Sequence, residues 1–294
     1  MKSNREMRDE AWGALFVRRW FGRLIAVSLL FFAVNTMVQL TFSSVCEVAG
    51  IMTVEDYRTE NKLSKITGEA PPVKPTKAQL PGIFAASAFE YFILFIFAGI
   101  AAYGNSRVQL KAARGEDGQD WFRGTLDGFK DPFGMLGLMF RQALQIFLWT
   151  LLLVVPGIVA AYRYRNAWFV KADHPDWSAG ACLRESGRLM RGRKGRAFLF
   201  DLSYWKWMLV MFAGFFILAC GASVTASPEA SSVLKALTIL VALGGFSLML
   251  VTGVVCGFYM TVGRAVFYRE LLADDSLSNA DVENAVGQEE QERI

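Results

Sequence analysis

The chain has 294 residues, of which 53% are hydrophobic and 14% aromatic, and its formal net charge is +4. A soluble domain is ~45–50% apolar, and here the excess is gathered into blocks of about 20 residues, the length needed to cross ~30 Å of hydrocarbon. The single histidine, His174, argues against metal and acid–base chemistry based on histidine. The four cysteines contain no CxxC pair, which argues against zinc and thioredoxin-like sites.

The N-terminal segment, residues 4–20, has the spacing of an amphipathic helix. Met7, Ala11 and Leu15 recur every four residues, which is the repeat of one helix face. The apolar block 24–46 follows basic residues. Because Lys and Arg collect in cytoplasmic loops, we expect this first span to run outward from the cytoplasm.

The second predicted span, residues 82–104, returns to the cytoplasmic side after a polar external loop, residues 47–80. Glu90 lies within this span, where a carboxylate is costly and usually faces a partner or a cavity. Asn35 and Gln39 on the first span are its expected hydrogen-bond partners. The three residues form a candidate intramembrane polar site. We favour a polar clamp between the two helices over a proton or cation site as its role.

The apolar run from Phe147 to Arg165 is interrupted by Pro156 and Gly157. Proline removes a backbone donor and clashes with the preceding turn, so these two residues are predicted to break the helix. Both flanking segments are basic and are therefore predicted to be cytoplasmic. Arg163 and Arg165 follow the break by six to eight residues, roughly 9–12 Å of helix rise. We therefore favour a re-entrant or strongly tilted segment over one that crosses twice.

Residues 175–197 are predicted to form a second cytoplasmic amphipathic helix, with Arg184, Arg188 and Arg191 on one stripe. Anionic lipid headgroups suit the basic cluster 188–196 better than nucleic acid does, because no aromatic side chains are interleaved there for base stacking. The candidate headgroup or phosphate contacts are Arg163, Arg165, Arg188, Arg191, Arg193, Lys194 and Asp201.

The apolar blocks 198–220 and 234–260 complete four clear spans, which places both termini in the cytoplasm. Asp201 is expected to pair with the basic segment 191–196. The last span contains the GxxxG match Gly253–Gly257, which lets helices approach closely within the molecule or between two copies.

The fold class is predicted to be all-α: a polytopic membrane helix bundle with four spans, the interrupted segment and two cytoplasmic amphipathic helices. Residues 1–272 form a single integral membrane domain in this prediction. Residues 273–294 form an acidic cytoplasmic tail, expected to be disordered because it is polar and rich in carboxylates. Cys46 and Cys220 should lie near the outer face, and two free thiols are favoured over a disulfide.

Several short motifs carry a family resemblance, most densely between residues 148 and 207. They include Leu148-Trp149, Pro156-Gly157-Ile158, Tyr162-Arg163-Tyr164, Ala172-Asp173-His174-Pro175, Met190-Arg191-Gly192-Arg193-Lys194 and, near the end, Phe267-Tyr268-Arg269-Glu270-Leu271. The chain thereby resembles a bacterial membrane-protein family catalogued as domain of unknown function 975. The resemblance implies a polytopic protein of the bacterial cytoplasmic membrane and brings no catalytic residues. Lys206 and the long loop 47–80 depart from the family pattern.

The sequence contains no Ser-His-Asp set, paired carboxylates, metal cluster or nucleotide motif. We therefore expect a non-enzymatic protein without a cofactor, which binds or moves a lipid or peptide or serves as a membrane subunit of a transport or stress-response assembly. Its expected partners are anionic headgroups and a membrane protein or second copy, and not nucleic acid. Two alternatives stay open. One is a channel or small-solute transporter using the Pro156-Gly157 break and Glu90. The other is an enzyme acting on lipid phosphates, for which Arg188, Arg191, Lys194 and Asp201 would have to converge on one pocket.

Overall fold

The computed structural model describes residues 2–17, 20–48, 61–64, 66, 80–116, 120–226 and 231–292, and in these ranges it contains helices and no strands. This confirms the all-α prediction. The helices are α1 (Asn4–Trp12), α2 (Trp20–Val48), α4 (Leu80–Arg114), α5 (Trp121–Leu126), α6 (Pro132–Leu152), α7 (Val154–Tyr164), α8 (Ala167–Asp173), α9 (Ala179–Leu189), α10 (Lys194–Leu202), α11 (Trp205–Ala226) and α12 (Ser232–Glu292), with a π-helical turn η1 (Gly13–Val17) and a 3-10 turn η3 (Asp127–Lys130).

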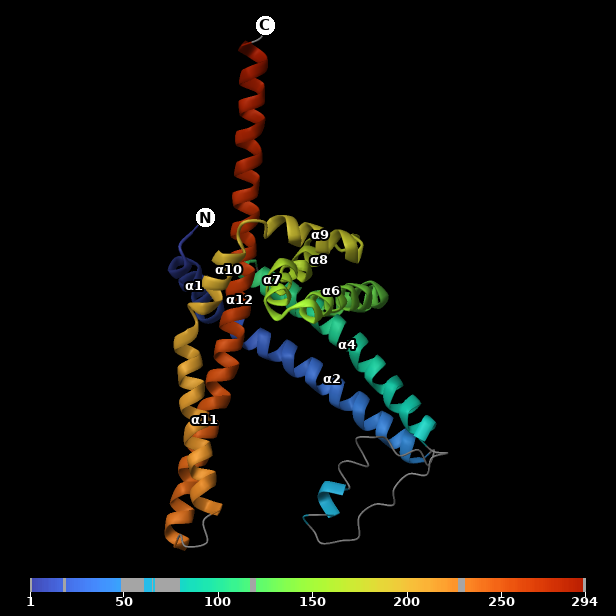
Figure 1. Ribbon diagram of the computed structural model, residues 1–294, viewed down its shortest axis with the longest axis vertical. Helices are drawn as coiled ribbons and strands as arrows, with labels where there is room; N and C mark the ends of the chain where they lie inside the picture. The colour runs from blue at the N-terminus through green and yellow to red at the C-terminus, as the bar shows by residue number, and fades with distance from the viewer. Residues whose placement is uncertain are drawn as a thin grey trace.

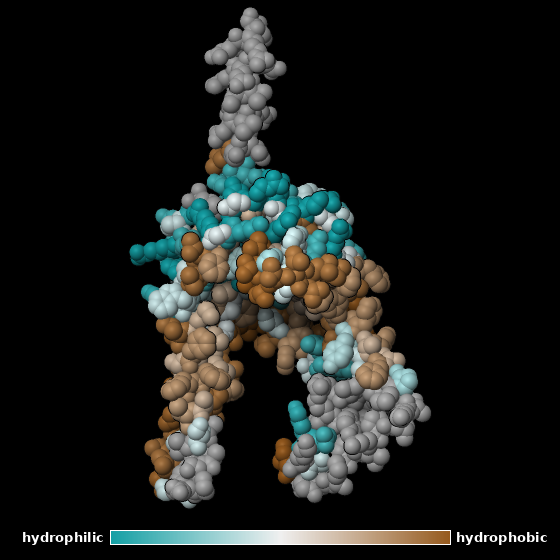
Figure 2. Space-filling model, in the orientation of Figure 1, coloured by the Kyte–Doolittle hydropathy of each residue, from teal (hydrophilic) through white to brown (hydrophobic). Residues whose placement is uncertain are grey.

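Two antiparallel helix pairs form the apolar half of the molecule. α2 packs against α4 and α11 packs against α12, and the two pairs diverge from a common end (Figure 1). The surfaces of the pairs are largely apolar, whereas the common end is hydrophilic (Figure 2). Four of the described helices, α2, α4, α6 and α12, are long and apolar enough to cross a membrane, and α11 qualifies together with α10, from which it is bent by 44°. The chain is therefore built as a polytopic membrane protein.

Glycines bring α11 and α12 into close contact. A Cβ on Gly214 would lie 2.9 Å from the carbonyl oxygen of Gly245, and a Cβ on Gly221 would lie 2.8 Å from an alanine Cβ on α12. Such small residues let helix backbones approach within a membrane. The predicted GxxxG match is not part of this close contact, because a Cβ on Gly257 would meet no atom within 4 Å and one on Gly253 only a methionine Cε at 3.8 Å.

The hydrophobic core lies at the hydrophilic end. We call this end the cap, and it comprises residues 2–17, 105–116, 120–131, 165–202 and 258–277. Met7, Ala11 and Leu15 are fully buried there, as their helical spacing predicts, against a core that includes residues of α9, α10 and α12. The N-terminal helix and the C-terminal half of α12 both lie at this end (Figure 1), which is the arrangement expected if both termini face one side of a membrane.

The interrupted apolar run folds as a helical hairpin. α6 ends at Leu152, Leu153 is extended with φ −165° and ψ 148°, and α7 begins at Val154. The predicted position of the break, Pro156 and Gly157, is therefore wrong, because both residues lie within the first turn of α7. The proline ring would clash with the carbonyl four residues earlier, so the preceding helix ends before it. In the first turn of the new helix, the missing N–H breaks no intrahelical hydrogen bond.

The α6–α7 hairpin starts from the cap and returns to it. α7 has 11 residues, about 16 Å of rise, which is too short to cross ~30 Å of hydrocarbon. In Figure 1, α6 runs across the molecule rather than along the helix pairs. Gly157 allows the two helices to touch, because a Cβ there would lie 2.8 Å from the Cα of Thr150. These features favour the re-entrant or tilted form over a double crossing.

Two predicted segments differ in extent from the structure. The helix expected over 175–197 is divided into α9 and α10 by a turn in which Gly192 has a φ of 75°, a value that favours glycine. The tail, expected to be disordered from residue 273, instead continues α12. Its Asp275 accepts hydrogen bonds from the guanidinium of Arg188 at 2.8 and 2.9 Å, which ties the start of the tail to α9.

Two predictions fall largely outside the described residues. Of the external loop 47–80, the structure describes little beyond 61–64 and 66, together with the residues at either end that belong to α2 and α4. The side chain of Cys46 is also outside the described set, while Cys220 is an exposed free thiol.

Candidate functional site

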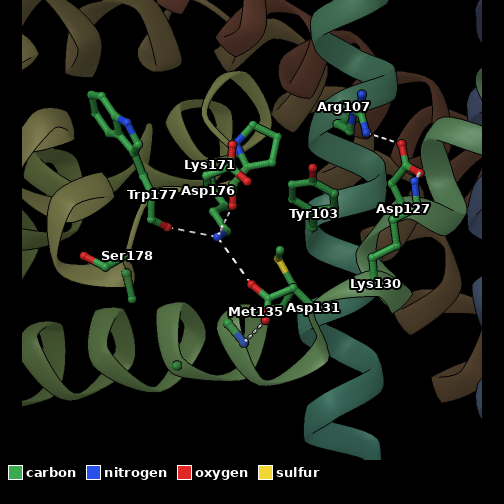
Figure 3. A pocket seen from close by; sticks show the side chains of 14 residues that line it. Tyr103, Arg107, Asp127, Lys130, Asp131, Met135, Lys171, Asp176, Trp177 and Ser178 are labelled. Atoms are coloured by element: carbon green, nitrogen blue, oxygen red, sulfur yellow. Dashed lines mark hydrogen bonds and ion pairs between the residues drawn. The ribbon is translucent and has the colours of Figure 1, made fainter.

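An open pocket of about 860 Å³ lies between the cap and the start of α6 (Figure 3). Its walls come from α4, η3, the first turns of α6, α8 and the loop before α9. The volume falls within the ~300–1,000 Å³ of pockets that hold small ligands. We call it the mixed-charge pocket, because it is lined by three carboxylates and three cations: Asp127, Asp131, Asp176, Arg107, Lys130 and Lys171.

Lys171 is the buried cation of this pocket, with a side chain that is only 4% exposed. Its ammonium donates hydrogen bonds to the carbonyl oxygens of Pro175 at 2.5 Å and Trp177 at 2.9 Å, and it lies 3.5 Å from Oδ2 of Asp131 (Figure 3). A buried ammonium is tolerated when such partners replace its water. Lys171 therefore fastens the loop before α9 to the start of α6 and fixes the distance between two walls.

The opposite wall is an ion-pair cluster around Asp127. Lys130 lies 2.8 Å from one carboxylate oxygen, and Arg107 pairs with the other. The hydrogen bond from Lys130, followed by the charge of Arg107, lowers the pKa of Asp127 below its usual range. Asp131 caps α6 by accepting a hydrogen bond from the backbone N–H of Gly134 at 2.8 Å. These contacts hold charged groups of both signs at fixed positions around the pocket.

The mixed-charge pocket adjoins an apolar surface on α6. Phe133, Phe140 and Phe147 are 76%, 59% and 61% exposed and recur every seven residues, so they share one helix face. We call this face the α6 stripe. Gly137 lies on the same face, four residues after Phe133, and also lines the pocket. Because a Cβ on Gly137 would meet no atom within 4 Å, no side chain separates the charged pocket from the apolar stripe at this point.

Residues 136–275 match the model of a family described as a protein of unknown function (DUF975). The resemblance inferred from the sequence motifs is thereby confirmed. The match runs from α6 to α12 and includes Lys171 and the loop before α9, but not the wall formed by α4 and η3. No curated protein and no solved structure matches the chain. The family's description names no activity, so the function has to be inferred from the geometry.

A second charged cluster joins α7, α10 and α12. The guanidinium of Arg165 is 10% exposed and forms hydrogen bonds with both carboxylate oxygens of Asp201 at 3.2 Å. Arg264 lies 3.4 Å from the same carboxylate, and Tyr162 donates a hydrogen bond to it at 3.2 Å. Burial lowers the pKa of Arg165, and Asp201 opposes this effect. The cluster has one more positive than negative charge and holds the hairpin against the cap.

The predicted pairing of Asp201 with residues 191–196 is wrong. Asp201 is seven residues beyond Lys194 on α10, a rise of roughly 10 Å, and its carboxylate instead meets Arg165 and Arg264. The predicted headgroup contacts are in fact divided among several places: Arg163, Arg188 and Arg191 line a pocket on α9, Arg165 and Asp201 belong to the second cluster, and Arg193 pairs with Asp274. The convergence required by the lipid-phosphate enzyme alternative is therefore not present among the described residues.

The predicted intramembrane polar site is not brought to the helix break. Glu90 is half-buried in the first third of α4, at the end far from the cap, whereas α7 with Pro156 lies at the cap end (Figure 1). Asn35 and Gln39 are exposed on α2. The clamp between these two residues and Glu90 stays a prediction, and the path required by the channel alternative gains no support.

Sequence reasoning missed Lys171, Asp127 and Trp177. Lys171 carried a usable signal, because it stands between Val170 and Ala172 in a helix whose preceding residues are all apolar and mostly buried. A lysine in such a stretch needs internal acceptors. Its partners could not be identified in advance, since they are two backbone carbonyls of a loop and one distant carboxylate.

Proposed function

We propose that the protein is a non-enzymatic membrane protein of the bacterial cytoplasmic membrane that binds lipid. In this proposal a zwitterionic headgroup occupies the mixed-charge pocket and the acyl chains lie along the α6 stripe. The observation that carries the proposal is the position of Gly137, which belongs both to the pocket lining and to the exposed apolar face. A lipid is the ligand class that needs a charged pocket and an apolar surface in direct continuity.

The chemistry of the pocket suits a headgroup with an ammonium and a phosphate. Asp131 has a 52% exposed side chain, and its carboxylate can accept from the ammonium. Lys130 is 80% exposed and paired on one side only, with Asp127, so it can donate to the phosphate. Such charge-assisted hydrogen bonds are stronger than neutral ones. Trp177 lines the rim, and tryptophan is favoured at membrane–water interfaces.

The orientation follows from the charge of the cap. Lys and Arg favour the cytoplasmic side, so the proposal places the cap and both termini in the cytoplasm and the α6–α7 hairpin in the inner leaflet. α1 then acts as an amphipathic helix at that surface, where anionic headgroups attract basic side chains. The open face at Gly257, where a Cβ would meet no atom within 4 Å, is available to a membrane-protein partner or a second copy.

Filling the pocket tests the proposal. Gly137→Trp places an indole where the structure has open space, so it should block the headgroup without disturbing the fold. Gly195→Trp on α10 is the matched control, since a Cβ there also meets no atom within 4 Å. We expect wild type and the control to retain phosphatidylethanolamine in native mass spectra after detergent extraction, and Gly137→Trp to lose it. Equal lipid retention by all three proteins would contradict the proposal.

A further inference from the structure

A second pocket, of about 540 Å³, lies on the outer face of the cap. Arg163 comes from α7, Arg184 and Arg188 from α9, and Arg191 from the turn that follows, with Glu185 as the single carboxylate in the described lining. We call it the arginine pocket. α9 lies on the side of the cap away from the helix pairs (Figure 1), so these arginines are not simply the basic flank of a membrane span.

The arginine pocket holds positive charge that the carboxylates of the described residues do not neutralise. Elsewhere in the cap, several arginines have carboxylate partners, as in the pairs of Arg114 with Asp173 at 2.8 Å and Arg165 with Asp201 at 3.2 Å. Within the arginine pocket, Glu185 is already bound by Arg188 at 2.7 Å. For the other three arginines, no carboxylate of the described residues lies within 4.0 Å. Three like charges lining one pocket repel one another, and an anion would remove that cost.

Arg163 and Arg188 are positioned by the fold and do not merely extend into solvent. The hydroxyl of Ser186 donates a hydrogen bond to the carbonyl oxygen of Arg163 at 2.9 Å, which joins α9 to α7. A Cβ on Gly187 would lie 2.9 Å from Nε of Arg163, so the glycine leaves room for this guanidinium to cross α9. Arg188 is fixed by Glu185 on one side and by Asp275 at 2.8 Å on the other. Two of the pocket's four arginines are therefore preorganised.

We propose that the arginine pocket binds a phosphomonoester or diphosphate group. The guanidinium presents a planar fork that matches phosphate oxygens two at a time. Three uncompensated charges suit a group with two or three negative charges better than they suit a single carboxylate. The volume leaves room for more than the phosphate itself, and Trp177, stacked on His174 at 4.1 Å, stands at the rim.

This site is distinct from lipid binding in the mixed-charge pocket and does not depend on it. Trp177 alone lines both pockets. The phosphate can come from a soluble compound or from the headgroup of an anionic lipid, because both present the same oxygens. The charge of the arginine pocket does not distinguish the two sources, so the experiment has one arm for each.

Titration calorimetry on the full chain in phosphatidylcholine nanodiscs tests the site, with inorganic pyrophosphate as the soluble probe. A parallel series measures the shift in unfolding temperature of the protein in nanodiscs that contain phosphatidic acid. We expect Arg184→Gln with Arg191→Gln to weaken binding about tenfold or more. Arg5→Gln with Arg123→Gln is the charge-matched control, because both arginines are exposed outside the pocket, and it should bind as wild type does.

Gly187→Ala separates a built site from a diffuse charge effect. The substitution changes no charge but displaces the guanidinium of Arg163, so we expect it to weaken pyrophosphate binding several-fold with an unchanged unfolding temperature. Pyrophosphate binding identifies a soluble source, and a response to phosphatidic acid alone identifies a lipid source. The proposal is overturned if wild type binds neither probe at physiological ionic strength, or if the control double variant loses as much affinity as the pocket variant.

Discussion

The cap and the two helix pairs are stabilised in opposite ways. In the cap, Phe200 and Phe267 are completely buried and several ion pairs join helices that are distant in sequence. In the helix pairs, Phe32 and Leu240 are 69% and 68% exposed, and only 11–17% of the residues in the apolar windows of α2, α4 and α12 are buried. Apolar surface of that extent is not stable in water. The cap is thus organised like a small soluble domain, and the pairs depend on hydrocarbon as their solvent.

The two regions should differ in how strongly a substitution changes the free energy of unfolding. Side chains of the helix pairs exchange contacts with protein for contacts with lipid tails, which are equally apolar, so no hydrophobic driving force acts between them. In the cap, replacing a large side chain by a small one opens a cavity in a packed core. The effect of a mutation should therefore depend on which region it is in more than on the residue type.

The largest effect is expected for Phe267→Ala in the cap end of α12. Phe267 is 0% exposed and packs against Phe200 with ring centroids 5.6 Å apart, so truncation should cost about 3–5 kcal/mol. Phe246→Ala on the same helix, at a side chain that is 42% exposed, should cost far less. Thermal unfolding of the two variants in one detergent measures the difference. Equal destabilisation by the two substitutions would contradict the proposed difference between the cap and the helix pairs.

A smaller effect is expected for Asp201→Asn in the cluster that holds the hairpin to the cap. The change leaves the guanidinium of Arg165, 10% exposed, without its carboxylate partner, which should cost about 2–3 kcal/mol. Arg264 loses the same partner but is 39% exposed, so adding Arg165→Gln removes the more buried of the two unpaired charges and should restore part of the loss. Unfolding temperatures of the single and double variants test this. A loss of stability in the double variant that exceeds the sum of the two single-variant losses would count against it.

The helix pairs were largely predictable because each membrane span is encoded locally. A span satisfies its backbone hydrogen bonds within the helix, so block length alone predicted 24–46 and 82–104, which lie inside α2 and α4. The helical spacing of Met7 and Leu15 was enough to predict one buried face that continues from α1 into η1. The first span and its partner required no knowledge of the rest of the chain.

The cap was much less predictable because its contacts join distant residues. Asp201 meets Arg165 and Arg264, 36 and 63 residues away along the chain, and neither helical spacing nor charge counting selects those partners. Lys171 depends on two carbonyl groups whose positions follow from the loop conformation. Charge density predicted that the arginines of 175–197 matter, but only the packing of α7 under Gly187 brings Arg163 among them.

The smallest effect is expected within the α11–α12 pair, where two glycines on similar backbones should behave differently. Gly257→Ala adds a methyl group into open space, so the free energy of unfolding should change by less than about 0.5 kcal/mol. Gly221→Ala forces a methyl group to within 2.8 Å of Ala242, an overpacking that should cost about 1–3 kcal/mol. Thermal unfolding of both variants checks the order. A substantial loss of stability with Gly257→Ala would mean that a second copy covers this open face in the membrane. The same variant should then lower the oligomeric mass measured by light scattering. A loss of stability with no change in mass would instead show that α12 packs differently from the close contact seen at Gly214 and Gly245.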